Sequence, residues 1–449
     1  MRSLKVSRRR FMTAASAGSL AAAAKTARAR PVVASAGRLA ILGGEPVRKN
    51  KRWPDWPHVD EAMVAAVAKT ARSGIWCRIQ TTSGAVAAFE AKFAELLGAK
   101  FCVATGSGTQ SLHTCVEAMG IGPGDEVITS PYTDPGTIAS ILAARALPVL
   151  ADLDRESFQL DPADVEKKIN GATKALMPVH MMGQPCDMQS MMSIAGRHGL
   201  RVIEDACQAH LAQHGGKRLG TIGDVGCFSF QSSKTLACGE GGAIVGNDEA
   251  LMDACYTVHN HGTSRRGRTE VAGPKYRMNE FEAAILLAQM PGLMERFERR
   301  NRNAAHLTAR LRDCPGIVPQ KLYAGTESGS FYLYAMTYRK EHFEGASRGT
   351  FLKALAAEGV DLSPYIAQGL HREPWIDHIV NSKIYRKMYS PERLARYRDE
   401  CACPRCDAVC QDLVMLWASG PLLGSTADMD DVADAILKVY EHRSELASI

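Results

Sequence analysis

The sequence has no hydrophobic run of 18 residues or more, so we expect no transmembrane helix. It has no internal repeat and, beyond its first thirty residues, no low-complexity stretch. Excess positive charge is also missing from most of the chain. The net charge of +6 comes from residues 1–30, which contain Lys and Arg but neither Asp nor Glu. We therefore expect no nucleic-acid partner and no polybasic membrane surface.

The composition is that of a globular protein. The 449 residues are 46% hydrophobic and 23% charged. A chain of this length is typically divided into two or three domains and buries a large core. We place a leader at residues 1–36, a large domain with an N-terminal arm at 37–290, and a smaller C-terminal domain at 291–449.

The leader has the pattern of a twin-arginine export signal. Arg8 and Arg9 precede Phe11 and Met12, and a weakly apolar stretch of Ala, Gly and Ser follows. This predicts export to the periplasm or the extracellular space, with no membrane attachment after the signal is removed. The alternative is a disordered basic tail on a cytoplasmic protein.

Thirteen cysteines are many for an exported chain. Nine of them lie singly within apolar patterns and suit small core residues. The other four lie within ten residues, at Cys401, Cys403, Cys406 and Cys410. Their spacing matches neither paired zinc-binding motifs nor a ferredoxin motif. A metal site, a disulfide and free thiols on a packed helix all remain open, and we assign no metal ligand.

Residues 85–260 alternate short apolar runs with helical periodicity. Strands are expected at 101–105, 125–130, 147–154, 173–180, 200–206 and 225–230. Helices are expected near 109–119, 136–146 and 188–198. Apolar strands separated by helices predict a doubly wound, mainly parallel sheet covered on both faces.

The texture changes after residue 278. A long helical stretch at 278–312 is interrupted at Pro291. A strand follows at 331–339, then a helix ending at Gly359 and a terminal helix over 429–443. This pattern predicts a smaller α/β domain joined to the first through the long helix.

Polar residues follow three of the expected strands, at the edge where parallel α/β sheets bind ligands. Gly106, Gly108 and a helix start at Thr109 form a candidate anion site, although the same residues suit an ordinary turn. Asp205 ends another strand and could equally cap the next helix. Lys234 follows a third and could be a surface lysine.

Together, these three features match what pyridoxal 5'-phosphate (PLP) requires. Its phosphate needs N–H donors, its protonated ring nitrogen needs an anion, and its aldehyde needs a lysine amine for a Schiff base. The helix start at Thr109, Asp205 and Lys234 supply these contacts.

The chain resembles the DegT/DnrJ/StrS family of PLP-dependent aminotransferases over about residues 38–445. The resemblance rests on eight blocks in the family order: "GSGTQSL", "GIGPGDEVITS", "PVHMMGQPCDM", "VIEDACQAHLA", "GDVGCFSFQSSK", "GEGGAIV", "HNHG" and "YRMNEFEAAIL". The segments "LAILGGEPVR", "WPDWP" and "LHREPWI" are most similar to the glutamine:scyllo-inosose branch.

This resemblance implies the aspartate-aminotransferase-like fold, PLP fold type I, and assigns roles to individual residues. Lys234 would be the Schiff-base lysine and Asp205 the partner of the ring nitrogen, and both would be catalytic. Gln208 would lie near the ring hydroxyl, and His180 and Gly183 would line the cleft, although His180 could be purely structural. The phosphate would be held by Gly108, Thr109, Gln110 and Ser229.

The sequence departs from the family pattern at two positions. Asp134 stands where the family usually stacks an aromatic residue on the cofactor, so Tyr132 or a neighbour would stack instead. Lys275 stands where the family commonly has an Asn that reaches the phosphate from a neighbouring subunit.

The resemblance implies a homodimeric transaminase. It would move an amino group from an amino acid, glutamine or glutamate, to a keto-cyclitol or keto-sugar. The alternative is a non-catalytic binding protein that keeps the fold or binds metal.

Overall fold

The computed structural model describes residues 37–449, and the predicted export signal lies outside them. Its centre is a seven-stranded sheet in the order β1-β9-β8-β5-β4-β2-β3. The strands are β1 (Phe101–Thr105), β2 (Glu126–Thr129), β3 (Leu147–Leu150), β4 (Thr173–Met177), β5 (Arg201–Asp205), β8 (Val225–Ser229) and β9 (Gly242–Gly246). The doubly wound, mainly parallel sheet predicted from the sequence is confirmed.

Strand β9 is the one strand of this sheet that the sequence pattern did not predict. It runs antiparallel to both of its neighbours, β1 and β8. Its sequence, GAIVG, is short and bounded by glycines, so it carried little strand signal. It lies between β1 and β8, and the helix that follows β1 packs against both β9 and β8.

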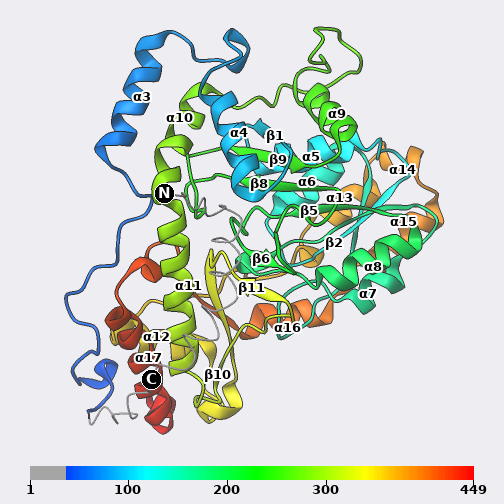
Figure 1. Cartoon of the computed structure of the whole chain (residues 1–449). Helices are drawn as coiled ribbons and strands as arrows, with labels where there is room; N and C mark the ends of the chain where they lie inside the picture. Colours follow the sequence, from blue (N-terminus) through cyan, green and yellow to red (C-terminus); the bar gives the residue numbers. More distant parts are fainter. Residues whose placement is uncertain (1–36) are drawn as a thin grey trace, which may run out of the picture.

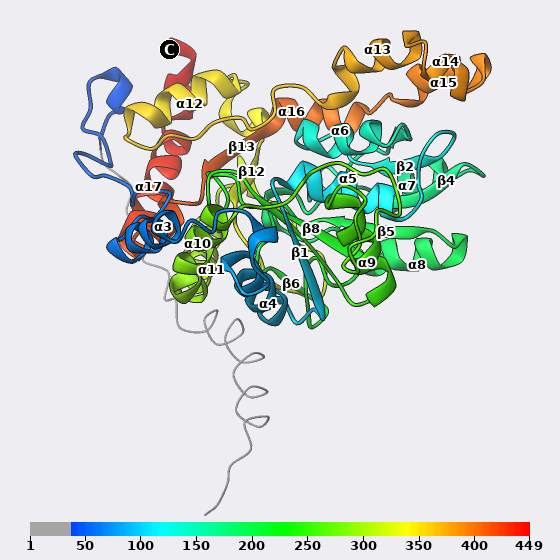
Figure 2. The same ribbon diagram turned by 90° about the horizontal axis from the view of Figure 1, so that it is seen from above.

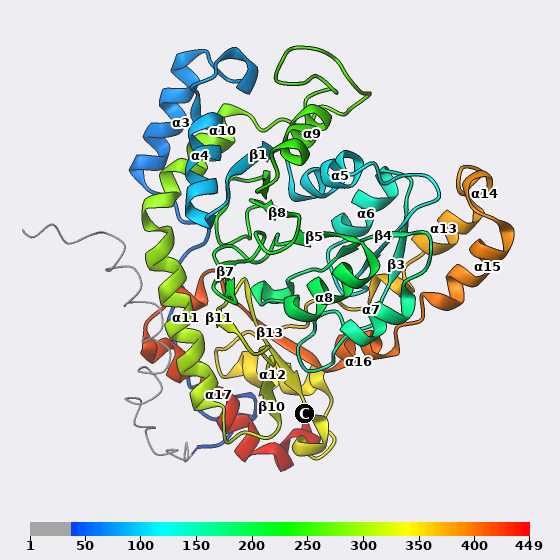
Figure 3. The same ribbon diagram turned by 45° about the vertical axis from the view of Figure 1, so that its right-hand side comes forward.

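Helices cover both faces of the sheet because side chains alternate along each strand. Cys102 and Ala104 of β1 pack toward α4, whereas Val103 packs toward α5 and α9. Figures 2 and 3 show the two helical layers. The covering helices are α4 (Ala85–Leu97), α5 (Gly108–Ala118), α6 (Pro135–Ala143), α7 (Pro162–Lys168), α8 (Met188–His198) and α9 (Glu249–His259).

The predicted long helical stretch is present as two helices, α10 (Glu280–Gln289) and α11 (Leu293–Arg310), joined by a 3-10 turn at Met290–Gly292. The turn contains Pro291, whose missing N–H and ring disfavour a continuous helix. The predicted boundary between residues 290 and 291 falls in this turn. Helix α11 runs along one side of the molecule toward α17 (Figure 1).

The C-terminal part contains a three-stranded antiparallel sheet with the order β10-β12-β13. Helices α12 and α17 pack against it in a second apolar core. The elements are β10 (Ile317–Pro319), β12 (Leu333–Tyr338), α12 (Arg348–Ala357), β13 (Leu413–Trp417) and α17 (Thr426–Glu441). A third small sheet joins β6 (Gln213–His214), β7 (Lys217–Arg218) and β11 (Thr326–Ser328).

Part of the C-terminal sequence returns to the large sheet. Tyr385 and Tyr389 donate hydrogen bonds from their hydroxyls to main-chain carbonyls of Ala146 and Asp125, beside β3 and β2. This segment forms four helices: α13 (Trp375–Asn381), α14 (Tyr385–Met388), α15 (Pro391–Glu400) and α16 (Pro404–Asp412). Figure 2 shows them extending beside α6 and α7.

The N-terminal arm, in turn, packs against the C-terminal part of the chain. Leu39 belongs to the C-terminal core, and the buried Glu358 carboxylate accepts from Ala40 N, Val47 N and Lys438 Nζ. Helix α3 (Glu61–Ser73) then packs along α10. None of the helices within residues 37–449 is long and apolar enough to cross a membrane.

Candidate active site

A cavity of about 410 Å³ lies at the carboxyl ends of β5 and β8, beside the N-terminal turns of α5 and α6. Six residues predicted from the sequence line it: Gly108, Thr109, Asp205, Gln208, Ser229 and Lys234. Other lining residues come from α6, the loop after β8 and the C-terminal part: Thr133, Asp134, Gly136, Thr137, Gln231, Ser233, Glu240, Tyr332 and Tyr365. The fold therefore brings the main sequence-predicted residues into one cavity.

The start of α5 forms one end of the cavity. Ser107 caps the helix, because its side chain accepts from Gln110 N. A Cβ on Gly108 would lie 2.8 Å from Cβ of Ser229, and a Cβ on Gly136 would lie 2.3 Å from Oγ1 of Thr109. The absence of side chains at these two positions lets helix N-termini and strand end approach closely, which suits an anion such as phosphate.

Asp205 is buried at the end of β5, with 3% of its surface exposed. Its Oδ2 accepts from Thr137 Oγ1 at 2.8 Å, and its Oδ1 accepts from Cys207 N at 3.2 Å. Thr137 Oγ1 lies 2.8 Å from Thr133 Oγ1. Neither threonine was predicted from the sequence, although both lie around the start of α6, next to the cavity residue Asp134.

We expect Thr137→Val to lower kcat of the amino-transfer reaction by about tenfold, because hydrogen bonds to charged groups contribute roughly 1.5–3 kcal/mol. Thr137 orients the Asp205 carboxylate, so the pH profile of kcat/KM should shift as well. Thr137→Ser keeps the hydroxyl and should restore both. A Thr137→Val enzyme with a normal rate and pH profile would contradict the assigned role.

Lys234 lies in a turn after β8, where its backbone N–H donates to Gln231 O at 2.8 Å. Its Nζ lies 4.2 Å from the ring centroid of Tyr332, the residue directly before β12. The Tyr332 hydroxyl is 2.9 Å from Ser233 Oγ. A residue of the C-terminal part thus holds the lysine amine inside the cavity by a cation–π contact.

Gln208 links the cavity to two other segments. Its Oε1 accepts from Met182 N at 2.8 Å, and its Nε2 donates to the Tyr365 hydroxyl at 3.2 Å. Burial raises the pKa of Tyr365 well above its ordinary value, so its hydroxyl stays protonated. Tyr365 and Tyr332 could not be assigned from the sequence, because they lie more than ninety residues beyond Lys234.

Five other residues proposed from the sequence do not line the cavity. Gln110 points its Oε1 toward Gly106, where an added Cβ would lie 2.7 Å away. Lys275 is exposed, and its backbone forms an isolated antiparallel β-bridge with Asn260. Its expected role is in a neighbouring subunit. The remaining three are Tyr132, His180 and Gly183.

Tyr132 cannot stack on a ligand in the cavity. Its side chain is fully buried in the core, and its hydroxyl accepts from Ile366 N at 3.4 Å. The expectation that Tyr132 replaces the missing aromatic residue is therefore corrected. Gly183 has φ of +84°, and a Cβ there would lie 2.7 Å from the Gln208 carbonyl oxygen, so it serves close packing.

His180 has the structural role that the sequence analysis left open. It is fully buried, and its Nε2 donates to Glu204 at 2.9 Å while its Nδ1 accepts from Cys186 N. The Glu204 carboxylate also accepts three backbone N–H groups from the loop 220–223. This buried network holds the loop against β5, directly before Asp205.

The four clustered cysteines are buried free thiols, on α16 and just before it, in the core beneath the C-terminal helices. Burial raises the pKa of Cys401 to about 12, which keeps its thiol protonated. Within residues 37–449, no three His, Cys, Asp or Glu side chains are grouped to hold a metal ion. The metal-binding alternative thus gains no support.

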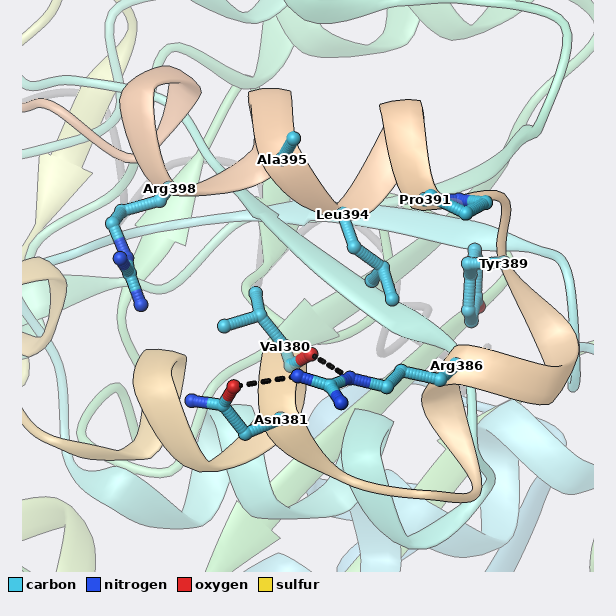
Figure 4. Close-up of a pocket in the computed structure, with 8 residues that line it drawn as sticks. All are labelled: Val380, Asn381, Arg386, Tyr389, Pro391, Leu394, Ala395 and Arg398. Atoms are coloured by element: carbon cyan, nitrogen blue, oxygen red, sulfur yellow. Dashed lines mark hydrogen bonds between the residues drawn. The ribbon is translucent and has the colours of Figure 1, made fainter.

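A second cavity of about 480 Å³ lies between α13, α14 and α15 (Figure 4). Its walls include Val380, Leu394 and Tyr389, and none of the residues proposed from the sequence. Arg386 donates to Val380 O and Asn381 Oδ1 across it. No Asp, Glu, His, Cys, Ser, Thr or Lys lines this cavity, and it shares no lining residue with the candidate active site.

The first cavity fits PLP in the chemistry of its groups. The first turn of α5 and the Ser229 hydroxyl offer donors for a phosphate, Asp205 offers a buried carboxylate, and Lys234 offers an amine. Among the residues that line it, Lys234 is the one amine. The fold and this site define a PLP-dependent enzyme of fold type I.

The chain belongs to the DegT/DnrJ/EryC1/StrS aminotransferase family, whose pattern matches residues 57–395. An L-glutamine:2-deoxy-scyllo-inosose aminotransferase of Streptoalloteichus tenebrarius is 35% identical, over 91% of this chain and 99% of that protein. The chain is thus a PLP-dependent aminotransferase, as the sequence resemblance predicted.

Two solved structures share the fold. 3-Amino-5-hydroxybenzoic acid synthase has a TM-score of 0.74 at 28% identity and covers 88% of this chain and 100% of its own. DesV of S. venezuelae, solved in complex with a ketimine intermediate, has a TM-score of 0.73 at 30% identity, over 86% of this chain and 99% of its own. The similarity therefore extends over nearly the whole length of both proteins.

Proposed function

We propose that the protein transfers an amino group from L-glutamine to a keto-cyclitol related to scyllo-inosose. The observation that carries the proposal is the meeting of Lys234, the Thr137–Asp205 pair and the start of α5 in one cavity. The donor and acceptor are inferred from several similar proteins of 33–35% identity, which are named glutamine:scyllo-inosose or 2-deoxy-scyllo-inosose aminotransferases.

We assign the cofactor contacts as follows. The turn at Gly108 and Thr109, together with Ser229, would hold the phosphate, Asp205 would be the partner of the ring nitrogen, and Lys234 would supply the amine for the aldehyde. When bound, PLP supplies an electron sink that stabilises negative charge on a substrate carbon. Thr137 Oγ1 and Cys207 N each donate to one carboxylate oxygen of Asp205, which fixes the orientation of this carboxylate.

Lys234 is the proton carrier in this proposal. It is the one basic side chain that lines the cavity, and the Tyr332 ring holds its Nζ. In the donor half-reaction, its amine would accept the Cα proton of the donor as a general base. In the separate acceptor half-reaction, it would donate a proton to the former carbonyl carbon of the acceptor as a general acid.

The test measures the two half-reactions separately with purified, PLP-loaded protein. Glutamine should change the visible absorbance of the bound cofactor, and scyllo-inosose added afterwards should restore it and yield an aminated cyclitol. Alanine in place of glutamine is the control for donor choice. A protein that binds PLP but does not respond to glutamine would refute the proposed donor, and one that responds to glutamine but not to keto-cyclitols would refute the acceptor.

We further propose a homodimer in which Lys275 acts in the neighbouring subunit's site. The proposal is supported by five exposed apolar side chains on α3 and on the segments directly before and after it: Val59, Val64, Ile75, Trp76 and Ile79, which are 39–65% exposed. Such surfaces mark protein interfaces more often than free surface. Lys275 itself is exposed and lies outside the cavity of its own chain.

Mixed dimers provide a sharp prediction. Lys234→Ala and Lys275→Ala subunits should each have little activity alone, whereas a mixture should recover part of it. In a mixed dimer, one site has an intact Lys234 from one chain and an intact Lys275 from the other. Failure to recover activity after subunit exchange, with mixed dimers shown by mass spectrometry, would place Lys275 outside the partner's site.

The dimer surface can be tested in the same protein. Ile79→Glu puts a charge on the apolar surface and should shift the protein to monomers in analytical ultracentrifugation. Leu322→Glu is the matched control, because Leu322 is also exposed, at 49%, but lies before β11. A dimer that tolerates Ile79→Glu as well as Leu322→Glu would contradict this interface.

We also propose that the protein is exported through the twin-arginine pathway, on the basis of residues 1–36. This pathway carries folded proteins, so the enzyme would acquire its cofactor before export. Replacing Arg8 and Arg9 by Lys should strongly reduce the exported fraction in cell fractionation, while Arg2→Lys should not. Equal cytoplasmic retention of the wild type, the Arg8 and Arg9 double variant and Arg2→Lys would indicate a basic tail instead of an export signal.

A further inference from the structure

Three aromatic side chains form a continuous wall at the edge of the cavity. Tyr332 and Tyr365 line it, and the Trp417 ring packs edge-on against both, with centroid distances of 5.9 Å and 6.4 Å. Tyr365 comes from the segment after α12, and Trp417 is the last residue of β13. We refer to these three residues as the aromatic wall.

Trp417 stands out within β13 by its exposure. The other four residues of the strand are buried, whereas Trp417 is 44% exposed. It pairs with Leu333 of β12, so strand alternation puts it on the same face as Leu413 and Met415. That face packs toward the large sheet, in the core that includes Tyr332. Trp417 does not itself line the cavity but packs against two residues that do, Tyr332 and Tyr365.

Carboxylates also line this cavity. Asp134 and Glu240 are both exposed, and Oδ1 of Asp134 accepts from Gly136 N at 2.8 Å. Carboxylate oxygens are acceptors for hydroxyl groups, whereas aromatic faces and edges suit apolar C–H groups. A cavity with both kinds of group is suited to a ligand with a hydroxylated rim and apolar ring faces.

We propose that the aromatic wall, with Trp417 as its outer member, binds the ring of the acceptor and selects polyhydroxylated cyclic ketones. This inference deepens the proposed function and rests on it. Tyr332 contacts both Trp417 and the amine of Lys234, at 5.9 Å and 4.2 Å between the ring centroid and its partner. A ring against this wall therefore presents its carbonyl carbon beside Lys234.

The test separates acceptor binding from donor chemistry. In Trp417→Ala, KM for scyllo-inosose should rise about tenfold, which corresponds to an aromatic contact of order 1 kcal/mol or slightly more. The rate of the glutamine half-reaction should change by less than about twofold. Trp417→Phe keeps an aromatic face and should recover most of the affinity, whereas Trp417→Leu keeps apolar bulk and should not.

The control variant is Trp53→Ala, because Trp53 packs over Arg48 in the N-terminal arm and not at the cavity. Binding of scyllo-inosose should also quench fluorescence in the wild type more than in Trp417→Phe. If Trp417→Ala does not fold, the Leu and Phe variants with this quenching measurement decide the question.

The proposal is overturned if Trp417→Ala or Trp417→Leu keeps the wild-type KM, or if the glutamine half-reaction falls as much as acceptor turnover. Failure of the proposed function looks different, because the wild type itself would then not respond to glutamine or to scyllo-inosose. If the wild type uses another keto-sugar, the same comparison of KM values is made with that acceptor.

Discussion

Lys234→Ala is expected to abolish transamination, with kcat reduced by at least about 10³-fold. Lys234 is the one amine among the residues that line the cavity, and the Tyr332 ring holds it in place. Its removal deprives both half-reactions of their proton carrier and the cofactor of its covalent anchor. Stopped-flow measurements with glutamine and dialysis of the loaded protein should show both losses.

The fold should survive this change, because Lys234 contributes its backbone N–H to the turn at Gln231, and alanine retains that group. Lys174→Ala, on the exposed side of β4, is the matched control and should keep full activity. Retention of more than about a tenth of the wild-type kcat in Lys234→Ala would assign the base to another residue.

Asp205→Asn should have the second largest effect, a loss of about 10²–10³-fold in kcat, comparable to removal of one preorganised electrostatic contact. Asparagine keeps the size of the side chain and can still bond to Thr137 at the end of β5. It does not keep the negative charge that balances a protonated ring nitrogen. The loss should therefore appear in kcat of both half-reactions, with little change in thermal unfolding.

Asp187→Asn is the control for Asp205→Asn. Asp187 caps α8 through Ser190 N, and it does not line the cavity. It should lower stability slightly, by about 1 kcal/mol or less, without a specific loss of kcat. If Asp205→Asn lowers the unfolding temperature strongly but leaves kcat unchanged, Asp205 is a structural residue of β5.

The strand-end residues could be predicted from the sequence for a physical reason. Apolar runs of four to six residues form buried parallel strands, and the carboxyl ends of such strands meet at one edge. Gly108, Asp205, Ser229 and Lys234 each follow an apolar run, so their convergence follows from the local pattern.

The direction in which individual side chains point could not be predicted from the sequence. Gln110 and Thr109 are neighbours at the start of α5, yet only Thr109 faces the cavity, because Gln110 occupies the space beside Gly106. Tyr132 lies two residues from Asp134, but it turns into the core while Asp134 stays at the cavity. His180 is held by hydrogen bonds to Glu204 and Cys186 N, and the spacing of these residues in the sequence does not predict this network.

The sequence by itself determined the mainly parallel sheet and the strand-end positions of Lys234 and Asp205, because these depend on local patterns of apolar and polar residues. The family followed from the resemblance of its motifs, which lie in the same order along the chain. The tertiary structure alone decided that Tyr332 and Tyr365 line the same cavity and that Trp417 packs against both. These three residues follow Lys234 by about 100 to 180 positions. They come together there because the C-terminal sheet packs its β12–β13 face against the large domain, a contact set by core packing and not by local sequence.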